Sequence, residues 1–169
     1  MAIHQSSCHN QEMPQEWIQS LGGMTYGLYV ITAGHGQNIG GMIASWVSQV
    51  SYAPPLIMIA VHPNRYTHNL IRDNESFVLH ILDREQLDFL SRFKGPDPAG
   101  KFSGLEWTPG LTGTPVLVDC PAYLECRVTS TLAPGNHTLF IGEIVQAGRR
   151  REVSPLTSLD YSGMYVGQD

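Results

Sequence analysis

Small and hydroxyl-bearing residues interrupt an otherwise apolar stretch at residues 42–51, and this stretch is the part of the sequence best suited to chemistry. A buried strand usually carries large β-branched and aromatic side chains. Ala44 and Ser45 instead leave room for a flat ligand to approach the backbone, and Trp46 adds an apolar wall with an indole N–H donor. We interpret the stretch as a strand edge shaped for a cofactor. The alternative is an ordinary core tryptophan beside small packing residues.

A second candidate contact lies downstream, at Arg65 and Thr67, close to the start of a short helix that we predict over residues 66–72. The first turn of a helix offers unpaired backbone N–H groups and a dipole that favours a phosphate. The Thr67 hydroxyl and the Arg65 guanidinium could complete such a cradle. The alternative is a simple helix cap with a solvated arginine. His68 could join the phosphate site or face solvent.

Strands dominate the elements that must position these residues. We predict strands at residues 28–32, 42–51, 56–61, 77–82, 123–131 and 138–145. Pro134-Gly135 predicts a hairpin between the last two. A second helix is expected from an Asp83 N-cap, with Gln86 three residues on, to about Phe93, and residues 95–115 are expected to form an irregular loop. Short strands with frequent turns favour a mainly β barrel with short peripheral helices, and the lack of regular strand–helix alternation argues against a Rossmann fold.

Composition narrows the class of protein. A chain of 169 residues with 42% hydrophobic and 15% charged residues is expected to form one compact domain, residues 17–169, preceded by a flexible arm of residues 1–16. The net charge of −5 disfavours a nucleic-acid partner. The polar N-terminus does not resemble a signal peptide, and no apolar run approaches the roughly 20 residues of a membrane span, so we expect a cytoplasmic protein without membrane contact.

The cysteines and histidines do not suggest a metal centre. Cys120 and Cys126 are not at a usual zinc spacing, and buried strand cysteines are the simpler interpretation, with a redox or metal role as the alternative. The histidines other than His68 and His137 are scattered along the sequence, at positions 4, 9, 35, 62 and 80. We therefore predict no metal site.

Several segments, taken in order over residues 21–148, resemble the flavin reductase-like family, and most of all its flavoredoxin type. The matching segments are Tyr26-Gly27-Leu28-Tyr29-Val30-Ile31-Thr32, Met42-Ile43-Ala44-Ser45-Trp46, Pro54-Pro55-Leu56, Tyr66-Thr67-His68, Phe77-Val78-Leu79, residues 119–126 and residues 135–143. The resemblance implies an FMN-binding split β-barrel (Greek-key-like) that works as a homodimer, with FMN near the subunit interface. It also implies transfer of hydride or electrons between NADH or NADPH, flavin and an acceptor.

The resemblance also implies roles for single residues. Lys101, before Phe102, would reach the FMN phosphate, and His137 would lie against the flavin, where it could position a nicotinamide or relay a proton. Tyr161 or Tyr165 would cover the ring from the partner subunit. The plain alternatives are a solvated loop lysine, an exposed turn histidine and simple tail packing. The full predicted cofactor set is Met42, Ile43, Ala44, Ser45, Trp46, Val47, Ser51, Arg65, Thr67, His68, Lys101, His137, Tyr161 and Tyr165.

Two positions depart from the family pattern. The family usually has asparagine at the position of Gly40 and threonine at the position of Ile43, so two polar contacts are missing or replaced. Asn38 could substitute.

The main functional hypothesis is an FMN-dependent oxidoreductase that passes electrons from NADH, NADPH or a protein donor to free flavin, ferric iron or an electron-transfer protein. The alternatives are a non-enzymatic FMN electron carrier and a ligand-binding barrel that has lost FMN.

Overall fold

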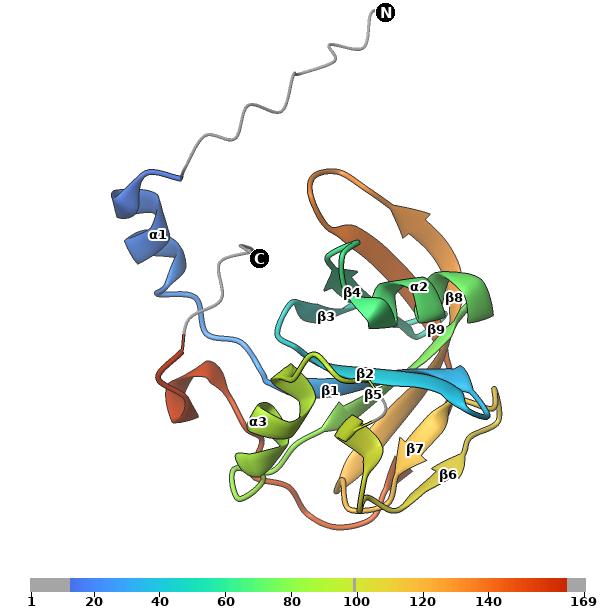
Figure 1. Ribbon diagram of the computed structural model, residues 1–169. Coiled ribbons are helices and arrows are strands. Elements are labelled where there is room, and N and C mark those ends of the chain that lie inside the picture. Colours follow the sequence, from blue (N-terminus) through green and yellow to red (C-terminus); the bar gives the residue numbers. More distant parts are fainter. Residues whose placement is uncertain (1–12, 99, 164–169) are drawn as a thin grey trace, which may run out of the picture.

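The computed structural model describes residues 13–98 and 100–163 and has one large antiparallel sheet wrapped into a barrel (Figure 1). Seven strands are hydrogen-bonded in the order β2-β1-β5-β8-β9-β4-β3, and β6 and β7 form a separate two-stranded ladder. The strands are β1 (Tyr29–His35), β2 (Asn38–Ala44), β3 (Val47–Ser51), β4 (Leu56–Val61), β5 (Ser76–Ile81), β6 (Trp107–Pro109), β7 (Pro115–Leu117), β8 (Ala122–Leu132) and β9 (Thr138–Arg149). The helices are α1 (Gln15–Leu21), α2 (Tyr66–Asn74), α3 (Asp88–Lys94) and the 3₁₀ turns η1 (Gly100–Phe102) and η2 (Ser158–Asp160). The prediction of a mainly β split barrel with short helices is confirmed.

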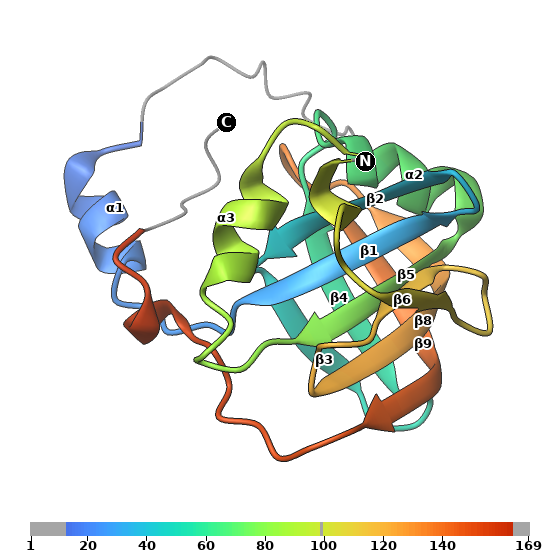
Figure 2. The same ribbon diagram turned by 60° about the horizontal axis from the view of Figure 1, so that its bottom comes forward.

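The strand order itself requires the sheet to close. β2 and β3 are the two opposite edges of the sheet, yet only Ser45 and Trp46 separate them in sequence. Because the three Cα–Cα steps from Ala44 to Val47 span only about 10–11 Å, the two edges must come together. The seam where they meet is therefore the bend at Ser45 and Trp46, and Figure 2 shows β2 and β3 on neighbouring walls of the barrel.

Two groups of buried side chains hold this arrangement. One fills the barrel and includes Ile31, Ile59, Phe77 and Phe140, each at most 1% exposed. The other lies between α3, η1 and the C-terminal tail. Its buried members are Leu28, Val30, Leu82, Phe89, Leu90, Phe93, Phe102, Leu117, Cys120 and Leu156. Cys120 and Cys126 are free and buried, and burial raises the pKa of each thiol to about 12, so neither is suited to thiolate chemistry.

Three predicted elements were wrong in extent. Residues 42–51 are not one strand, because β2 ends at Ala44 and the chain turns into β3. The second helix begins at Asp88 and not after Asp83, whose carboxylate accepts the backbone N–H groups of Glu85 and Ser154 instead of capping a helix. The predicted irregular loop contains η1 and β6, and its last residue begins β7.

The N-terminal helix α1 was not predicted and begins inside the expected arm. It stands away from the barrel and contributes no buried residue (Figures 1 and 2). Residues 1–12 of that arm lie outside the described residues. Within the described ranges, no helix is both long and apolar enough to cross a membrane.

His80 makes the stability of the barrel depend on pH. Its ring is fully buried, Nε2 accepts the Leu117 N–H at 3.0 Å, and Nδ1 lies 3.2 Å from the Val30 carbonyl oxygen, so the neutral ring donates from Nδ1. Burial lowers the pKa of His80 from 6.5 to about 3, and the charge of Arg150 adds to the shift. Below pH 6.5 only the unfolded chain gains this proton, so the free energy of unfolding should fall by about 1.4 kcal/mol per pH unit until the pH nears the folded pKa.

Urea unfolding between pH 7 and pH 4.5 checks this expectation. His80→Gln has no ionisable ring and should be less stable at pH 7 but show a shallower decline on acidification. Identical declines in the two proteins would contradict the assignment of this slope to His80.

Candidate functional site

A cleft of about 640 Å³ opens at the seam between β2 and β3. Its volume lies within the range of small-molecule and cofactor sites. Its walls come from the end of β2, the start of α2, the end of α3 and the turn before β9, together with η1 and the tail after η2.

The middle of the cleft is the bend from β2 into β3. Ala44 and Ser45 are 5% and 9% exposed, and Met42, Ile43 and Trp46 also line the cleft. The Trp46 carbonyl oxygen accepts the Ala60 N–H at 3.0 Å, which ties the bend to β4. Small side chains on a tethered backbone give a flat surface along which a planar ring could lie.

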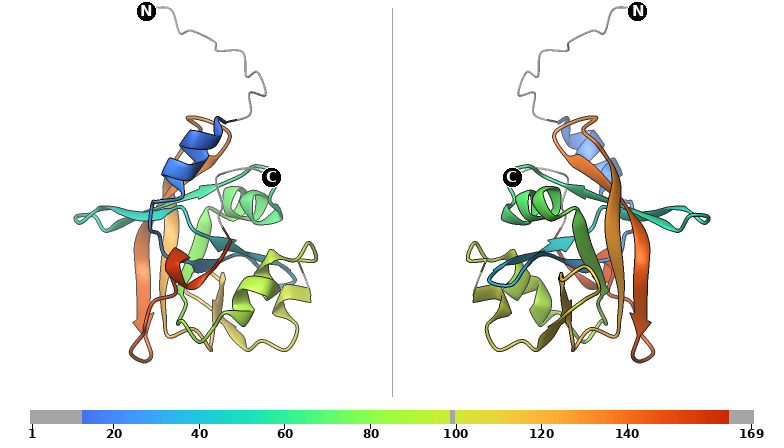
Figure 3. Two further views of the ribbon diagram at one scale, coloured as in Figure 1. Left: turned by 90° about the vertical axis from the view of Figure 1, so that its left-hand side faces the viewer. Right: turned by 90° about the vertical axis from the view of Figure 1, so that its right-hand side faces the viewer.

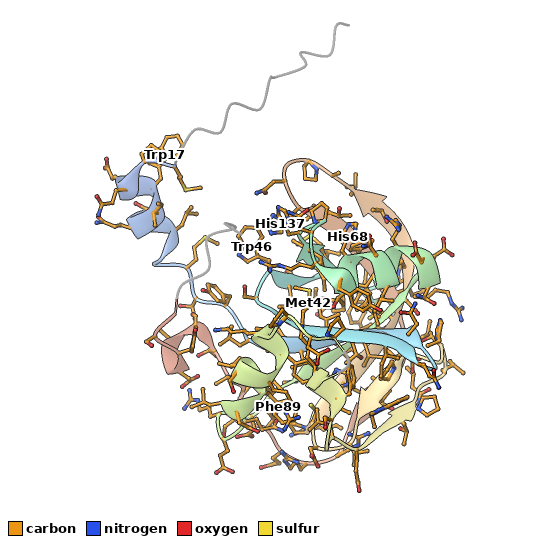
Figure 4. The ribbon with its side chains drawn as sticks, viewed as in Figure 1. Trp17, Met42, Trp46, His68, Phe89 and His137 are labelled. Carbon is orange, nitrogen blue, oxygen red and sulfur yellow. The ribbon has the colours of Figure 1, made fainter. Side chains whose placement is uncertain are left out.

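His137 closes this surface on one side. Its ring centroid lies 4.7 Å from that of Trp46 at a 45° tilt, and both residues line the cleft; Figure 4 shows the two labelled side chains close together. Its Nδ1 is 2.8 Å from the side-chain oxygen of Asn136, so the neutral ring donates from Nδ1 and keeps Nε2 as an acceptor.

His62 belongs to the same group of rings, although we predicted no site for it from the sequence. It lines the cleft and meets His137 edge-on, with ring centroids 5.1 Å apart. Its Nδ1 accepts the Asn64 N–H at 3.2 Å. The available signal was its position directly after the apolar strand β4, at the end from which α2 begins.

Positive side chains gather at the α2 end of the cleft. Arg65, Thr67 and Lys101 all line it, and Thr67 lies in the first turn of α2. The Lys101 ammonium donates to the Gly41 carbonyl oxygen at 2.9 Å. Burial lowers the pKa of Lys101, and the charge of Arg65 lowers it further, while Asp97 raises it. Two mutually repelling cations beside a helix N-terminus favour an anion such as a phosphate.

The opposite wall comes from α3 and the tail. Lys94 and Tyr161 both line the cleft, and the Lys94 ammonium lies 4.0 Å from the centroid of the Tyr161 ring and donates to its hydroxyl. No aspartate or glutamate of the described ranges lines the cleft, and these ranges hold no group of three or more histidine, cysteine or acidic side chains that could bind a metal ion.

The family described as "Flavin reductase like domain" matches residues 21–167. The chain belongs to this family. It is 32% identical over 149 residues to a ferric-chelate reductase (NAD(P)H) of Archaeoglobus fulgidus, covering 86% of this chain and 88% of that protein. It is 36% identical over 157 residues to a putative diflavin flavoprotein A 2 of Synechocystis sp., covering 91% of this chain but only 27% of that longer protein.

A solved member of similar structure is the NADH:FAD oxidoreductase SgcE6 of Streptomyces globisporus C-1027. It superposes with a TM-score of 0.77 at 27% identity, covering 88% of this chain and 92% of SgcE6. The flavin reductase-like fold is thus found in solved relatives of nearly the same length.

Within this flavin reductase-like domain, most of the predicted cofactor residues line one cleft. They are Met42, Ile43, Ala44, Ser45, Trp46, Arg65, Thr67, Lys101, His137 and Tyr161. The others do not meet there: Val47 and Ser51 lie on β3 outside the cleft lining, and Ser51 is at the far end of the strand, paired with Leu56. Tyr165 lies outside the described residues.

His68 is also placed elsewhere than predicted. It follows Thr67 on α2, and a step of one residue turns a helical side chain by about 100°. Its Nε2 lies 2.9 Å from the Thr138 hydroxyl, and its ring packs on Phe140, with centroids 5.2 Å apart. His68 is therefore a packing residue under α2, and burial lowers its pKa.

The structure explains one of the two departures from the family pattern. A Cβ atom on Gly40 would lie 2.8 Å from Leu70 Cδ1 and 3.0 Å from Tyr66 Cδ1, so α2 occupies the space that an asparagine would need. The predicted substitute, Asn38, does not line the cleft, because its side-chain oxygen accepts the Tyr66 hydroxyl at 2.5 Å. Ile43 does line the cleft and gives it an apolar contact where the family has a hydroxyl.

The donors of this cleft suit FMN. A phosphate would meet Arg65, Lys101 and the Thr67 hydroxyl, and the isoalloxazine would lie along Ala44 and Ser45 toward Trp46.

Proposed function

We propose that this protein is an FMN-dependent oxidoreductase that uses NADH or NADPH and passes electrons to free flavin, ferric iron or an electron-transfer protein. The observation that carries the proposal is a single cleft with cations at a helix N-terminus, small residues along its middle and a tryptophan–histidine wall. The names of the ferric-chelate reductase and of the NADH:FAD oxidoreductase among its relatives support this class of reaction. When bound, FMN supplies the redox chemistry by accepting a hydride and releasing electrons.

The residues of the chain bind the cofactor and orient it. Arg65, Thr67 and Lys101 hold the phosphate by charge-assisted hydrogen bonds. Ala44 and Ser45 let the ring approach the backbone of the bend, and the bend excludes water from that side. Binding the ring in one orientation converts a chance encounter with the nicotinamide into a positioned one.

His137 is proposed to position the nicotinamide, because its ring is held by Trp46, His62 and Asn136 at the edge of the bend. His137→Gln should lower the rate of NADH oxidation by the FMN-loaded protein about 10²-fold, the order of loss expected from a misplaced substrate. Single-turnover stopped-flow spectroscopy measures this rate. His35→Gln, on an exposed side chain at the end of β1, is the matched control. A His137→Gln rate equal to that of the control would remove His137 from the mechanism.

A non-enzymatic FMN electron carrier is the second candidate. The observation that favours it is the diflavin flavoprotein, in which the matching segment is about a quarter of a longer chain. A carrier would bind FMN with the same residues but exchange electrons only with a protein. Rapid mixing with NADH and with NADPH separates the two, because only the oxidoreductase loses its flavin absorbance at a useful rate. A barrel that has lost FMN would bind none.

We also propose that the protein is a cytoplasmic homodimer. Helix α1 exposes Trp17 (62%) and Leu21 (41%), and Tyr52 (90%), in the turn between β3 and β4 that projects in Figure 3, is exposed as well. A seven-residue helix with no buried residue is unstable by itself, so a second copy of the chain is the proposed partner of α1. Sedimentation at the mass of one chain would contradict the dimer.

A further inference from the structure

Lys94 is a cation of the cleft that the proposed FMN contacts do not use. It is the last residue of α3, and its ammonium lies over the face of Tyr161, 4.0 Å from the ring centroid, while also donating to the Tyr161 hydroxyl. A lysine that only complemented the dipole of α3 would not need this second, specific partner. The contact restricts a long side chain to the rim of the cleft.

Tyr161 directly follows the capped turn η2 and packs, partly buried, against the second group of core side chains. Leu156 is 1% exposed, and its backbone bonds to Leu28 and Leu82. The next turn, η2, is capped by reciprocal bonds between Thr157 and Asp160, and Asp160 pairs with Arg84 at 3.2 Å. Because the side chain is ordered before any ligand arrives, the entropy lost on binding an anion is reduced.

The charge of the cleft exceeds what one phosphate requires. Three of the chain's ten lysines and arginines line it, namely Arg65, Lys94 and Lys101, and its lining within the described ranges includes no acidic residue, although the charge of Asp97 acts on Lys101. This occurs in a protein of net charge −5. A positive cleft in a negative protein concentrates polyanionic ligands.

The three cations form two groups. Lys101 bonds to Gly41 of β2, and the charges that shift its pKa are those of Arg65 and Asp97. Lys94 instead contacts the tail. Two ligands that each carry an anionic group, such as FMN and a nicotinamide dinucleotide, would use both groups of cations.

We propose that Lys94 binds a phosphate of the reduced nicotinamide dinucleotide and so determines affinity for the second substrate, with Tyr161 as its positioning residue. This inference rests on the proposed function. The phosphate could be the pyrophosphate, which NADH and NADPH share, or the 2′-phosphate, which only NADPH carries.

The test compares Lys94→Gln with Arg72→Gln, which removes the same charge from an exposed side chain on α2 that pairs with Asp73. FMN affinity is first measured by quenching of flavin fluorescence. Binding of NAD⁺ and NADP⁺ to the FMN-loaded proteins is then measured by calorimetry, and KM is measured for NADH, NADPH and reduced nicotinamide mononucleotide. Tyr161→Phe, which keeps the ring and loses the hydroxyl, is measured alongside.

Lys94→Gln should raise the dissociation constant and KM of a dinucleotide about tenfold to hundredfold, as expected for a lost charge-assisted bond, with the FMN dissociation constant within about twofold of wild type. An equal loss of affinity for both dinucleotides would show that Lys94 binds the pyrophosphate. A loss of affinity for NADPH alone would show that Lys94 binds the 2′-phosphate. Tyr161→Phe should give a smaller loss in the same direction. If the dissociation constants and KM values for the dinucleotides are the same in Lys94→Gln as in Arg72→Gln, the inference is overturned and the proposed function is unaffected. A wild-type protein that binds no FMN overturns the proposed function instead, and this inference with it.

Discussion

Replacing Arg65 and Lys101 together by glutamine is expected to weaken FMN binding by about 10²–10⁴-fold, since each charge-assisted hydrogen bond contributes roughly 1.5–3 kcal/mol. The two side chains line the same end of the cleft, and Arg65 lowers the pKa of Lys101, so they act on a common region. A bound phosphate would relieve this repulsion. Fluorescence titration of the apoprotein with FMN measures the change.

Riboflavin is the sharpest control, because it has the ring of FMN without the phosphate. Its affinity should change less than about twofold in the double variant if the ring contacts lie at Ala44 and Ser45. Arg72→Gln should leave FMN affinity at the wild-type value. An equal loss for riboflavin and FMN would show that the two cations do not bind the phosphate.

Replacing Glu125 by leucine is expected to lower the free energy of unfolding by about 2–5 kcal/mol. Glu125 is fully buried on β8, and its carboxyl oxygens accept the backbone N–H groups of Leu111 and Thr112. A Cβ atom on Gly110 would lie 2.5 Å from its Oε2, so the turn between β6 and β7 packs directly on this carboxyl group. Leucine would leave two N–H groups without an acceptor inside the protein. Urea denaturation measures the loss.

Glu125→Gln keeps one side-chain oxygen acceptor and should lie between wild type and Glu125→Leu. Glu152→Leu, at an exposed position, should cost less than about 0.5 kcal/mol. Equal stabilities of Glu125→Leu and Glu152→Leu would contradict the assigned role of the buried carboxyl group.

The barrel could be predicted because apolar runs separated by turn residues indicate its strands in the sequence. Pro134 and Gly135 ended one apolar run and began the next, and the hairpin of β8 and β9 follows from that signal. The break between β2 and β3 could not be predicted in the same way. The pattern of small and apolar residues continues through Ser45 and Trp46, and periodicity does not reveal that Ala44 and Val47 lie on opposite edges of the sheet.

The site residues could be predicted where the side-chain type and its local setting alone indicate a binding role. Arg65 with Thr67 at a helix start, and small residues beside Trp46, were identified from local physics, and the structure brings them to one cleft. Lys94 was missed because nothing near it in sequence distinguishes it from a solvated side chain, and His62 was missed because its position directly after β4 was not used as a signal. They reach the cleft only through the folding of β4 and α3 around the seam.

Anaerobic stopped-flow mixing of the FMN-loaded protein with NADH, and separately with NADPH, is the decisive test of the oxidoreductase. At least one nucleotide should bleach the bound flavin much faster than it bleaches FMN free in solution. Flavin that binds but bleaches no faster than free FMN with either nucleotide would contradict the oxidoreductase and leave the electron carrier.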